Sequence, residues 1–270
     1  MPVHDDLGKR LKNNYENVMK YRLTCRTPVI IRIDGRAFHT FARKFQKPFD
    51  HILMNSMQQT MKYLCANIQG CVLGYTQSDE ISLLLVDYQH FESQPWFDNE
   101  VQKITSISAS MATMIFNKVF TENVNTYLDY YRRGKTIWTP EESDKKYIFG
   151  LTRARDTGAM FDSRCFNIPR EEVTNYFFWR QNDATRNSIQ MVGQAYFSHK
   201  ELHKKTCSMI QEMLHEQKGI NWNDFSVPEK RGTCCIKTEA GWTIDENIPI
   251  FKGDGREYVE RFVYPKEDNT

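Results

Sequence analysis

Apolar residues along this chain of 270 residues follow two different spacings. Short runs rich in β-branched residues occupy 29–33 and 81–85, and turn residues bound each run, which is typical of buried strands. Between these runs, apolar side chains recur at helical spacing and stop before Gly70, which predicts a helix. They are Leu53, Met57, Met61, Leu64 and Ile68. A second helical stripe predicts a helix from about Val101 to Val119.

The order of the predicted elements is strand, helix, hairpin, helix and strand. The hairpin spans Cys71 to Tyr88, and the last strand runs roughly from Ala159 to Ile168. This is the order of a ferredoxin-like split βαβ unit, so the expected fold class is α+β. We expect a core over residues 1–168, with an irregular or mobile insertion around 121–158, because glycine and proline punctuate a polar segment there.

The remaining residues, 169–270, differ in composition and are expected to form a helical and β-hairpin elaboration packed on the core as one unit. A helix is predicted over Glu171 to Gln194. Ser198 and Glu201 have the spacing of a capping box before another helix. The alternating pattern from Arg231 onward predicts a terminal hairpin.

Two carboxylates lie where predicted strands meet turns. Asp34 precedes Gly35 at the end of the first strand, and Asp79 lies beside Glu80 at the hairpin turn. Carboxylates fixed on neighbouring strand ends can hold hard divalent cations, which prefer oxygen ligands and keep positions free for phosphates. The pattern therefore indicates metal-assisted phosphoryl or nucleotidyl transfer. The alternative is that both are ordinary turn residues, since Asp is common in turns.

The composition sets the surroundings of such a site. A net charge of +2 gives no global signal for nucleic acid, so a polyanion site has to be a local basic surface. Seven cysteines without framework or zinc-type spacing favour reduced thiols, and the adjacent Cys234 and Cys235 suit alternate faces of a strand. The N-terminus lacks the apolar core of a signal peptide, and no apolar run has the length of a membrane span. We expect a cytoplasmic protein without a membrane partner.

Four blocks of the sequence, taken in order, resemble the tRNA-His guanylyltransferase family, and more closely its bacterial-type branch of tRNA-His guanylyltransferase-like proteins. The blocks are Asp34-Gly35-Arg36-Ala37-Phe38-His39, Gln77-Ser78-Asp79-Glu80, Phe161-Asp162-Ser163-Arg164 and Trp179-Arg180-Gln181-Asn182-Asp183. The likeness runs from about Leu7 to Lys237.

The resemblance implies a palm domain of the polymerase and cyclase type that adds nucleotides in the 3′–5′ direction, to the 5′ end of a tRNA. The 5′ end is first adenylylated with ATP, or already carries a triphosphate, and the 3′-hydroxyl of the incoming nucleotide then attacks it. The resemblance further implies two Mg²⁺ ions, ATP and GTP or other nucleoside triphosphates as substrates, tRNA as partner, and a homotetramer.

Site residues follow from the same likeness. The expected catalytic residues are Asp34, Asp79 and, in a supporting role, Glu80, while the metal ligands are Asp34, Asp79 and the carbonyl of Gly35. The predicted nucleotide-binding residues are Asp34, Gly35, Arg36, Ala37, Phe38, His39, Lys47, Ser78, Asp79 and Lys103. Phe38 can equally be an ordinary core aromatic, and both lysines can be solvated surface residues.

A second, mostly basic set is predicted to bind tRNA, because RNA backbones and unpaired bases are bound by basic and aromatic side chains. It comprises Arg153, Arg155, Arg164, Arg180, Arg186 and Asn187. Trp179 is interleaved with this set, but we expect it mainly in the core, as is usual for an aromatic residue on an apolar helix. Arg180 has the structural alternative of an i,i+3 pair with Asp183.

One segment departs from the family pattern. Where the eukaryotic enzymes carry His-Ile-Asn-Asn-Leu-Tyr-Asn, this chain has Thr-Arg-Asn-Ser-Ile-Gln-Met at 185–191 and keeps only Asn187 at a matching place. The departure favours templated repair of 5′-truncated tRNAs over tRNA-His-specific guanosine addition, which stays an alternative. A nucleotide cyclase and a non-catalytic RNA-binding module are further alternatives. The second leaves Asp34 and Asp79 unexplained, because carboxylates repel phosphate unless a metal lies between them.

Overall fold

The computed structural model describes residues 5–133 and 142–264. Its centre is one antiparallel sheet in the order β4-β1-β3-β2-β5-β6. The first four strands are β1 (Val29–Gly35), β2 (Cys71–Gln77), β3 (Glu80–Leu85) and β4 (Phe161–Asn167). Their order confirms the predicted ferredoxin-like unit. The remaining two, β5 (Thr233–Thr238) and β6 (Gly241–Asp245), extend the sheet beyond β2.

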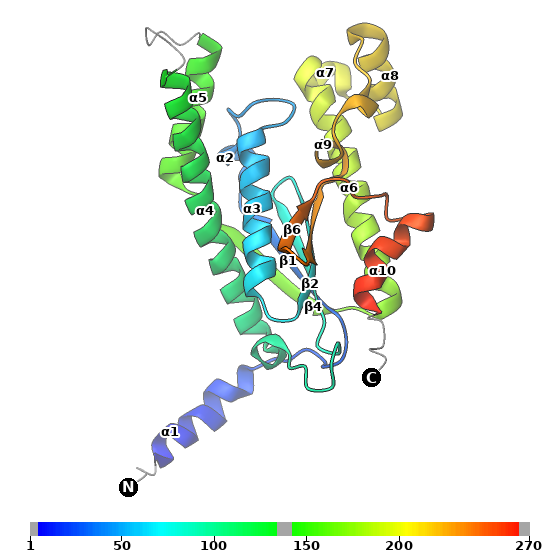
Figure 1. Cartoon of the computed structure of the whole chain (residues 1–270). Coiled ribbons are helices and arrows are strands. Elements are labelled where there is room, and N and C mark those ends of the chain that lie inside the picture. Colours follow the sequence, from blue (N-terminus) through cyan, green and yellow to red (C-terminus); the bar gives the residue numbers. More distant parts are fainter. Residues whose placement is uncertain (1–4, 134–141, 265–270) are drawn as a thin grey trace.

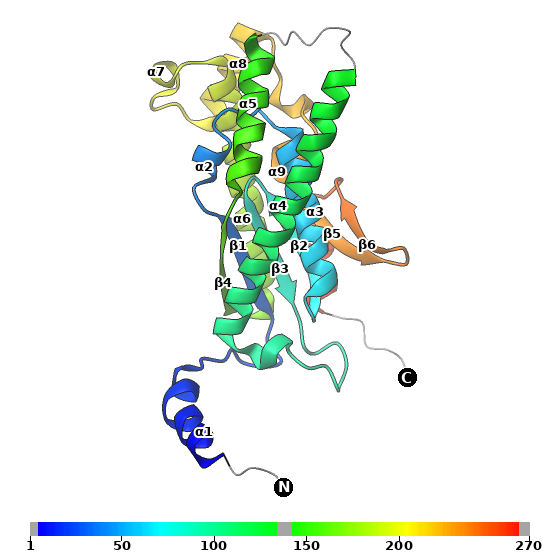
Figure 2. The ribbon, with the colours of Figure 1, turned by 90° about the vertical axis from the view of Figure 1, so that its left-hand side faces the viewer.

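Helices cover both faces of the sheet (Figures 1 and 2). On one face lie α3 (His51–Asn67) and α4 (Val101–Arg133), and on the other lie α6 (Arg170–Tyr196) and α10 (Glu257–Val263). Because side chains alternate along a strand, each strand supplies both cores. Cys234 and Cys235 confirm this alternation, since Cys234 packs in the α6-side core and Cys235 in the α3-side core.

The segment predicted as an irregular insertion is helical in its described part, so that prediction was wrong. Helix α4 continues past Val119 to Arg133, and α5 (Glu142–Thr157) returns beside it. Residues 134–141 of the expected insertion lie outside the described residues. The apolar period of α4 extends through the polar-looking region, with buried side chains at every fourth position: Phe116, Phe120, Val124 and Leu128. Gly150, which looked like a loop signal, lets the turn after residue 41 pack closely on α5, because a Cβ there would lie 2.7 Å from Cβ of Lys44.

The C-terminal third is mostly helical, with α7 (His199–Leu202), α8 (Cys207–Lys218) and α9 (Val227–Arg231) following α6. The predicted capping box at Ser198 is present and begins the four-residue α7. The predicted terminal hairpin ends at Asp245, since α10 follows it. At the other end, α1 (Asp6–Leu11) projects from the body (Figure 1). Across the described ranges, no helix has both the length and the apolar character needed to cross a membrane.

Candidate active site

The two predicted metal-binding carboxylates meet at one end of the sheet. Asp34 is the penultimate residue of β1, and Asp79 lies in the turn between β2 and β3. The amide of Gly35 donates to the backbone carbonyl of Asp79 at 3.1 Å, so the two chain segments are joined directly. Ser78, at a φ of 51°, donates from its hydroxyl to Oδ1 of Asp79 at 3.0 Å. The structure thus places the carboxylates on adjoining strand ends, as the sequence predicted.

The electrostatics of this pair favour a bound cation. Burial raises the pKa of Asp79, and the nearby charge of Asp34 raises it further, whereas the hydrogen bond from Ser78 acts in the opposite direction. A divalent cation between the two carboxylates would relieve the repulsion between them. Within the described ranges, no group of three or more His, Cys, Asp or Glu side chains is arranged to hold a metal. Two carboxylates and a carbonyl are enough for Mg²⁺, which completes its shell with waters and substrate phosphates.

Charged residues form two rows on the α6 face of the sheet, one of carboxylates across three strands and one of arginines across two. Asp34 lies opposite Glu80 of β3 and opposite Asp162 of β4. Two residues back along β1, or about 7 Å at the rise of an extended strand, Arg32 lies opposite Arg164 of β4. A row of carboxylates is therefore followed by a row of arginines.

Glu80 is held by a buried ion pair with Arg180 of α6. Nε of Arg180 donates to Oε1 of Glu80 at 2.8 Å, and the two side chains are only 7% and 9% exposed. The second arm of the guanidinium donates to Asp183 at 2.8 Å. Burial raises the pKa of Glu80, and the charge of Arg180 opposes that rise. Glu80 therefore fixes α6 to β3 at the turn that carries Asp79, which is a supporting role.

Arg180 is consequently not available to bind tRNA, and its prediction as a tRNA-binding residue was wrong. The structural alternative, the pair with Asp183, is confirmed and is supplemented by Glu80. The sequence did not indicate this second partner because Glu80 lies 100 residues earlier in the chain.

The loop after β1 is shaped by Gly35 and Phe38. A Cβ on Gly35 would lie 2.2 Å from the ring of Phe38, so only glycine leaves room for that ring. Phe38 is buried among Phe41, Phe116 and Phe161, which confirms the core-aromatic alternative. The ring therefore supports the loop from below, while the neighbouring side chains Arg36, Ala37 and His39 are exposed.

A cavity of about 330 Å³ lies beside this loop. Arg36 and Ala37 line it from the loop and Arg153 lines it from α5. The guanidinium of Arg153 donates to the carbonyl of Thr40 at 2.9 Å. The structure thus brings one predicted nucleotide-binding arginine and one predicted tRNA-binding arginine to the same cavity.

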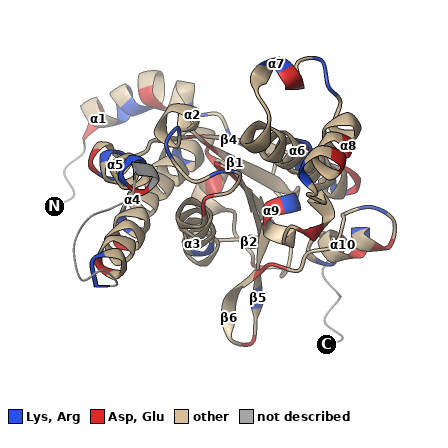
Figure 3. Cartoon of the chain, turned by 90° about the horizontal axis from the view of Figure 1, so that it is seen from above, with Lys and Arg blue, Asp and Glu red and all other residues tan. Residues whose placement is uncertain are grey.

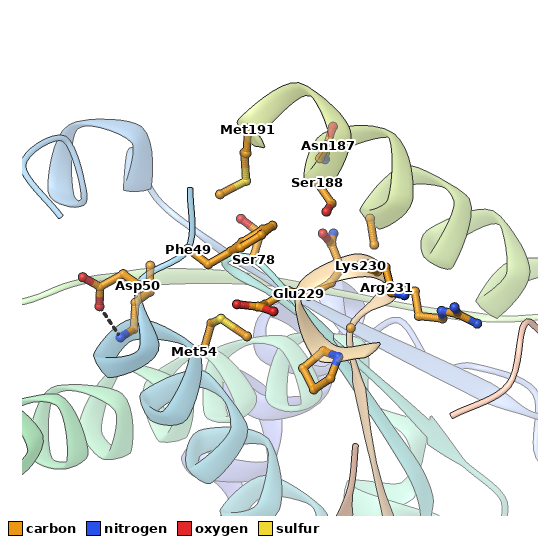
Figure 4. Close-up of a pocket in the computed structure, with 15 residues that line it drawn as sticks. Phe49, Asp50, Met54, Ser78, Asn187, Ser188, Met191, Glu229, Lys230 and Arg231 are labelled. Atoms are coloured by element: carbon orange, nitrogen blue, oxygen red, sulfur yellow. Dashed lines mark hydrogen bonds between the residues drawn. The ribbon is translucent and has the colours of Figure 1, made fainter. Parts of the chain in front are cut away.

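A second cavity, of about 80 Å³, opens beside Ser78 (Figure 4). Its walls come from the start of α3, the turn after β2, helix α6 and helix α9. They include Phe49, Met54, Asn187, Met191 and Arg231. Asp50 also lines the cavity, but its carboxylate caps α3 through the amide of Leu53 at 2.9 Å. Asn187 therefore lines the same cavity as Ser78 of the turn between β2 and β3, whereas the sequence had assigned it to tRNA.

Two other predicted residues, Lys103 and Arg155, lie away from the carboxylates. The hydroxyl of Thr113 on α4 accepts a hydrogen bond from the amide of Phe161, which lies opposite Gly35 of β1. Lys103 is ten residues before Thr113, so it lies about 15 Å along the helix from the level of Gly35. It pairs with Glu100 at 3.5 Å instead, and the structure does not bring it to the carboxylates of its own chain. Arg155 donates to Asn125 at 2.8 Å on α4, and Lys47 is exposed.

Trp179 was expected mainly in the core, and this expectation was wrong: 53% of the residue is exposed, whereas Phe177 is fully buried. Sequence reasoning also passed over Arg32. The signal for it was present, because a residue two positions before Asp34 on a strand shares its face.

Seen from above, acidic positions at the end of β1 lie between α2 (Phe38–Phe41), α3, α6 and α9, whose surroundings carry many basic positions (Figure 3).

Comparison with known proteins agrees with this geometry. The sequence model of the family described as tRNAHis guanylyltransferase matches residues 8–169. The curated tRNA(His) guanylyltransferase of Debaryomyces hansenii is 27% identical over 243 residues, which cover 84% of this chain and 81% of the relative. The uncharacterized protein R259 of Acanthamoeba polyphaga mimivirus is 25% identical over 245 residues, covering 87% and 78%.

Solved structures are similar over nearly the whole chain. A bacterial tRNA(HIS) guanylyltransferase (Thg1)-like protein in complex with ATP superposes with a TM-score of 0.80 at 44% identity, covering 96% of this chain and 99% of the other. A bacterial protein of the same description in complex with GTP gives a TM-score of 0.73 at 41% identity, covering 96% of this chain and 100% of the other. The tRNA(His) guanylyltransferase from Saccharomyces cerevisiae shares the fold, with a TM-score of 0.62 at 20% identity. The match covers 87% of this chain and 96% of the other.

Proposed function

The chain belongs to the tRNAHis guanylyltransferase family, a family of nucleotidyltransferases, and from this premise we propose that it extends 5′-truncated tRNAs in the 3′–5′ direction. The observation that carries the proposal is the junction of Asp34 and Asp79, fixed by the bond between Gly35 and Asp79. A non-catalytic RNA-binding module has no use for two adjoining carboxylates, which repel RNA phosphates.

Asp34, Asp79 and the carbonyl of Gly35 would hold Mg²⁺, and two such ions are proposed. Bound Mg²⁺ neutralises phosphate charge and lowers the pKa of a coordinated hydroxyl. The raised pKa of Asp79 supports the assignment, because no cationic side chain among the described residues lowers the pKa of that carboxylate. The remaining lone pairs of both carboxylates stay available to an ion.

The chain's own groups would then position the substrates. Arg36, with a guanidinium suited to phosphate oxygens, faces the cavity shared with Arg153, so we assign these two side chains to a triphosphate. Phe49, Met54 and Met191 give the cavity beside Ser78 an apolar lining that suits the flat face of a nucleobase. ATP and GTP are the proposed ligands, and the two bacterial relatives bind ATP and GTP.

The proposed reaction has three steps. The 5′-phosphate of the RNA attacks the α-phosphate of ATP and releases pyrophosphate, which leaves an adenylylated end. The 3′-hydroxyl of the incoming nucleoside triphosphate attacks the terminal RNA phosphate, losing its proton, and AMP leaves. Hydrolysis finally removes pyrophosphate from the new 5′ end.

Templated repair is favoured over guanosine addition restricted to tRNA-His by the sequence at 185–191. Asn187, the one residue retained there, lines the cavity beside Ser78. The histidine and tyrosine of the eukaryotic motif are replaced here by Thr185 and Gln190, so the chain lacks those two side chains. Assembly as a homotetramer in the cytoplasm stays part of the proposal by family likeness.

The test is incubation of the purified protein with 5′-labelled truncated tRNA, ATP, all four nucleoside triphosphates and Mg²⁺. We expect extension by wild type, loss of extension in Asp34→Ala and Asp79→Ala, and ordinary extension in Asp129→Ala, which changes an exposed aspartate of α4. Conversion of the triphosphate without change in the RNA would instead indicate a cyclase. A shift of the RNA without any chemistry would indicate a binding module.

A further inference from the structure

Trp179 presents an aromatic face to solvent at the border of the arginine row. The residue is 53% exposed, although it lies one position after the partly buried Phe178 and two after the fully buried Phe177. Its position on the surface is tied to the sheet through Tyr176. The two rings lie 6.0 Å apart, and the Tyr176 hydroxyl lies 2.8 Å from that of Ser82. Ser82 is the cross-strand neighbour of Arg32.

The indole of Trp179 packs against the guanidinium of Arg180. The guanidinium carbon of Arg180 lies 4.3 Å from the centre of the Trp179 ring, which is a cation–π contact. That guanidinium cannot turn away, because Glu80 and Asp183 hold it at 2.8 Å each. An exposed aromatic ring fixed in this way loses little conformational freedom when a planar group stacks on it.

Arg32 supplies a cation with unused bonding capacity. Its Nε is buried and has no hydrogen-bond partner in the described part of the chain. Such an orphaned charged donor is costly unless a ligand satisfies it. Across the strand pair, Arg164 is half-exposed and donates one arm to Asp162 at 2.6 Å. Both arginines lie one row behind Asp34 and Asp162 on the same face.

We propose that Trp179, Arg32 and Arg164 form the site that receives the 5′-terminal segment of the RNA strand. An unpaired base stacks on Trp179, and the adjoining phosphates contact Arg32 and Arg164. The inference rests on the proposed function and adds the side chains that recognise the RNA end. In this arrangement Asp162 is a positioning residue, because its carboxylate orients the guanidinium of Arg164.

Charge and placement favour single-stranded RNA over other occupants. A stacking ring beside paired arginines is the combination that binds unpaired nucleotides independently of their sequence. A free nucleoside triphosphate is a weaker candidate, because two cavities lined by other residues, one beside Ser78 and one beside Arg36, suit it. The Trp179 surface is connected to Asp34 by a short series of contacts through Arg180 and Glu80.

The experiment places 2-aminopurine at the 5′-terminal position of a truncated tRNA, and in a second RNA at an internal position. With wild type, the terminal probe should be quenched on binding by stacking, while the internal probe is unaffected. Trp179→Ala should abolish terminal quenching and raise the KM for RNA about 5- to 150-fold, the range for losing one base stack. Trp179→Phe should restore part of both. The matched control is Tyr196→Ala, an exposed aromatic at the far end of α6.

The arginines are tested by salt dependence. Arg32→Gln and Arg164→Gln should each reduce the slope of log affinity against log salt by about 0.7, the value for one phosphate contact on a single strand. The KM for GTP should stay unchanged. Arg170→Gln, at the start of α6, is the control. Unchanged RNA KM and quenching in Trp179→Ala, with extension intact, would overturn the inference and leave the proposed function standing. If the wild-type protein quenches the terminal probe but does not extend the RNA, the proposed function would be overturned and the proposed binding site would stand.

Discussion

Replacing Arg180 with methionine is expected to destabilise the protein severely, because it removes one partner of a buried ion pair. Arg180 and Glu80 are 7% and 9% exposed and 2.8 Å apart. Methionine fills much of the arginine volume but leaves the Glu80 carboxylate buried without its cation. Breaking such a pair costs about 3–5 kcal/mol. At about 2–4 °C per kcal/mol for domains near this size, Tm should fall by roughly 6–20 °C.

The double variant Glu80→Met/Arg180→Met separates this mechanism from a loss of packing. When both charges are removed, no carboxylate is left unpaired, and apolar replacement of a buried pair is often close to neutral. We therefore expect the double variant to be more stable than Arg180→Met alone. Arg186→Met is the matched control. Arg186 also pairs with Asp183, but its side chain is 61% exposed, and exposed pairs contribute about 0–1 kcal/mol.

The defect should also depend on pH. Burial raises the pKa of Glu80 in the folded protein and Arg180 opposes that rise, so the variant raises the pKa further. A carboxyl whose pKa is higher in the folded than in the unfolded protein contributes stability at low pH. That contribution is lost as the pH rises through the folded-state pKa. The deficit of Arg180→Met should therefore shrink on acidification, as followed by thermal unfolding from pH 7 to pH 5. A pH-independent deficit, or a double variant no better than the single, would refute the reasoning.

Three further predictions concern nucleotide addition and tRNA binding. Asp79→Asn should abolish nucleotide addition yet raise Tm at neutral pH without Mg²⁺, since the raised pKa of Asp79 means that its charged form destabilises the fold; an unchanged or lower Tm by calorimetry would contradict this. A tRNA lacking its first 5′ nucleotide should be extended faster than intact tRNA-His, and changing the opposing template base should change the nucleotide incorporated, as gel analysis of the products will show; guanosine added regardless of that base would exclude templating. Arg186→Gln should weaken tRNA binding and its salt dependence without affecting the KM for GTP, because this arginine is exposed; an impaired GTP KM would assign it to the nucleotide site instead.

The local sequence determined the strands and helices of the ferredoxin-like unit. Apolar runs at 29–33 and 81–85 form β1 and β3 because both are buried on each face, and Asp34 and Asp79 lie at their ends because the runs stop there. The four family blocks were equally local. The position of the two carboxylates could therefore be predicted from hydrophobic pattern, turn chemistry and strand order alone.

Helix continuation past Val119 was harder to predict, because polar residues and glycines are read locally as loop signals. Helices α4 and α5 pack against each other through the buried apolar side chains that each carries, while Gly150 of α5 allows the turn that contains Lys44 to approach closely. A glycine that breaks an isolated helix can allow close packing in a tertiary structure. Only the partner decides which of these applies.

The roles of individual charged residues were decided by the tertiary structure. Arg180, Arg186 and Trp179 lie within eight positions on one helix, yet one is buried in an ion pair, one is paired at the surface, and one is exposed. Helical periodicity gives the angle between these side chains. It does not show which face of the helix the sheet covers, or that Glu80 on the sheet pairs with Arg180. Burial of a charge depends on a partner distant in sequence, because desolvation is tolerated only where an opposite charge and its hydrogen bonds compensate it. The sequence therefore determined where the carboxylates of this protein lie, and only the folded chain determined which arginines remain free to meet a phosphate.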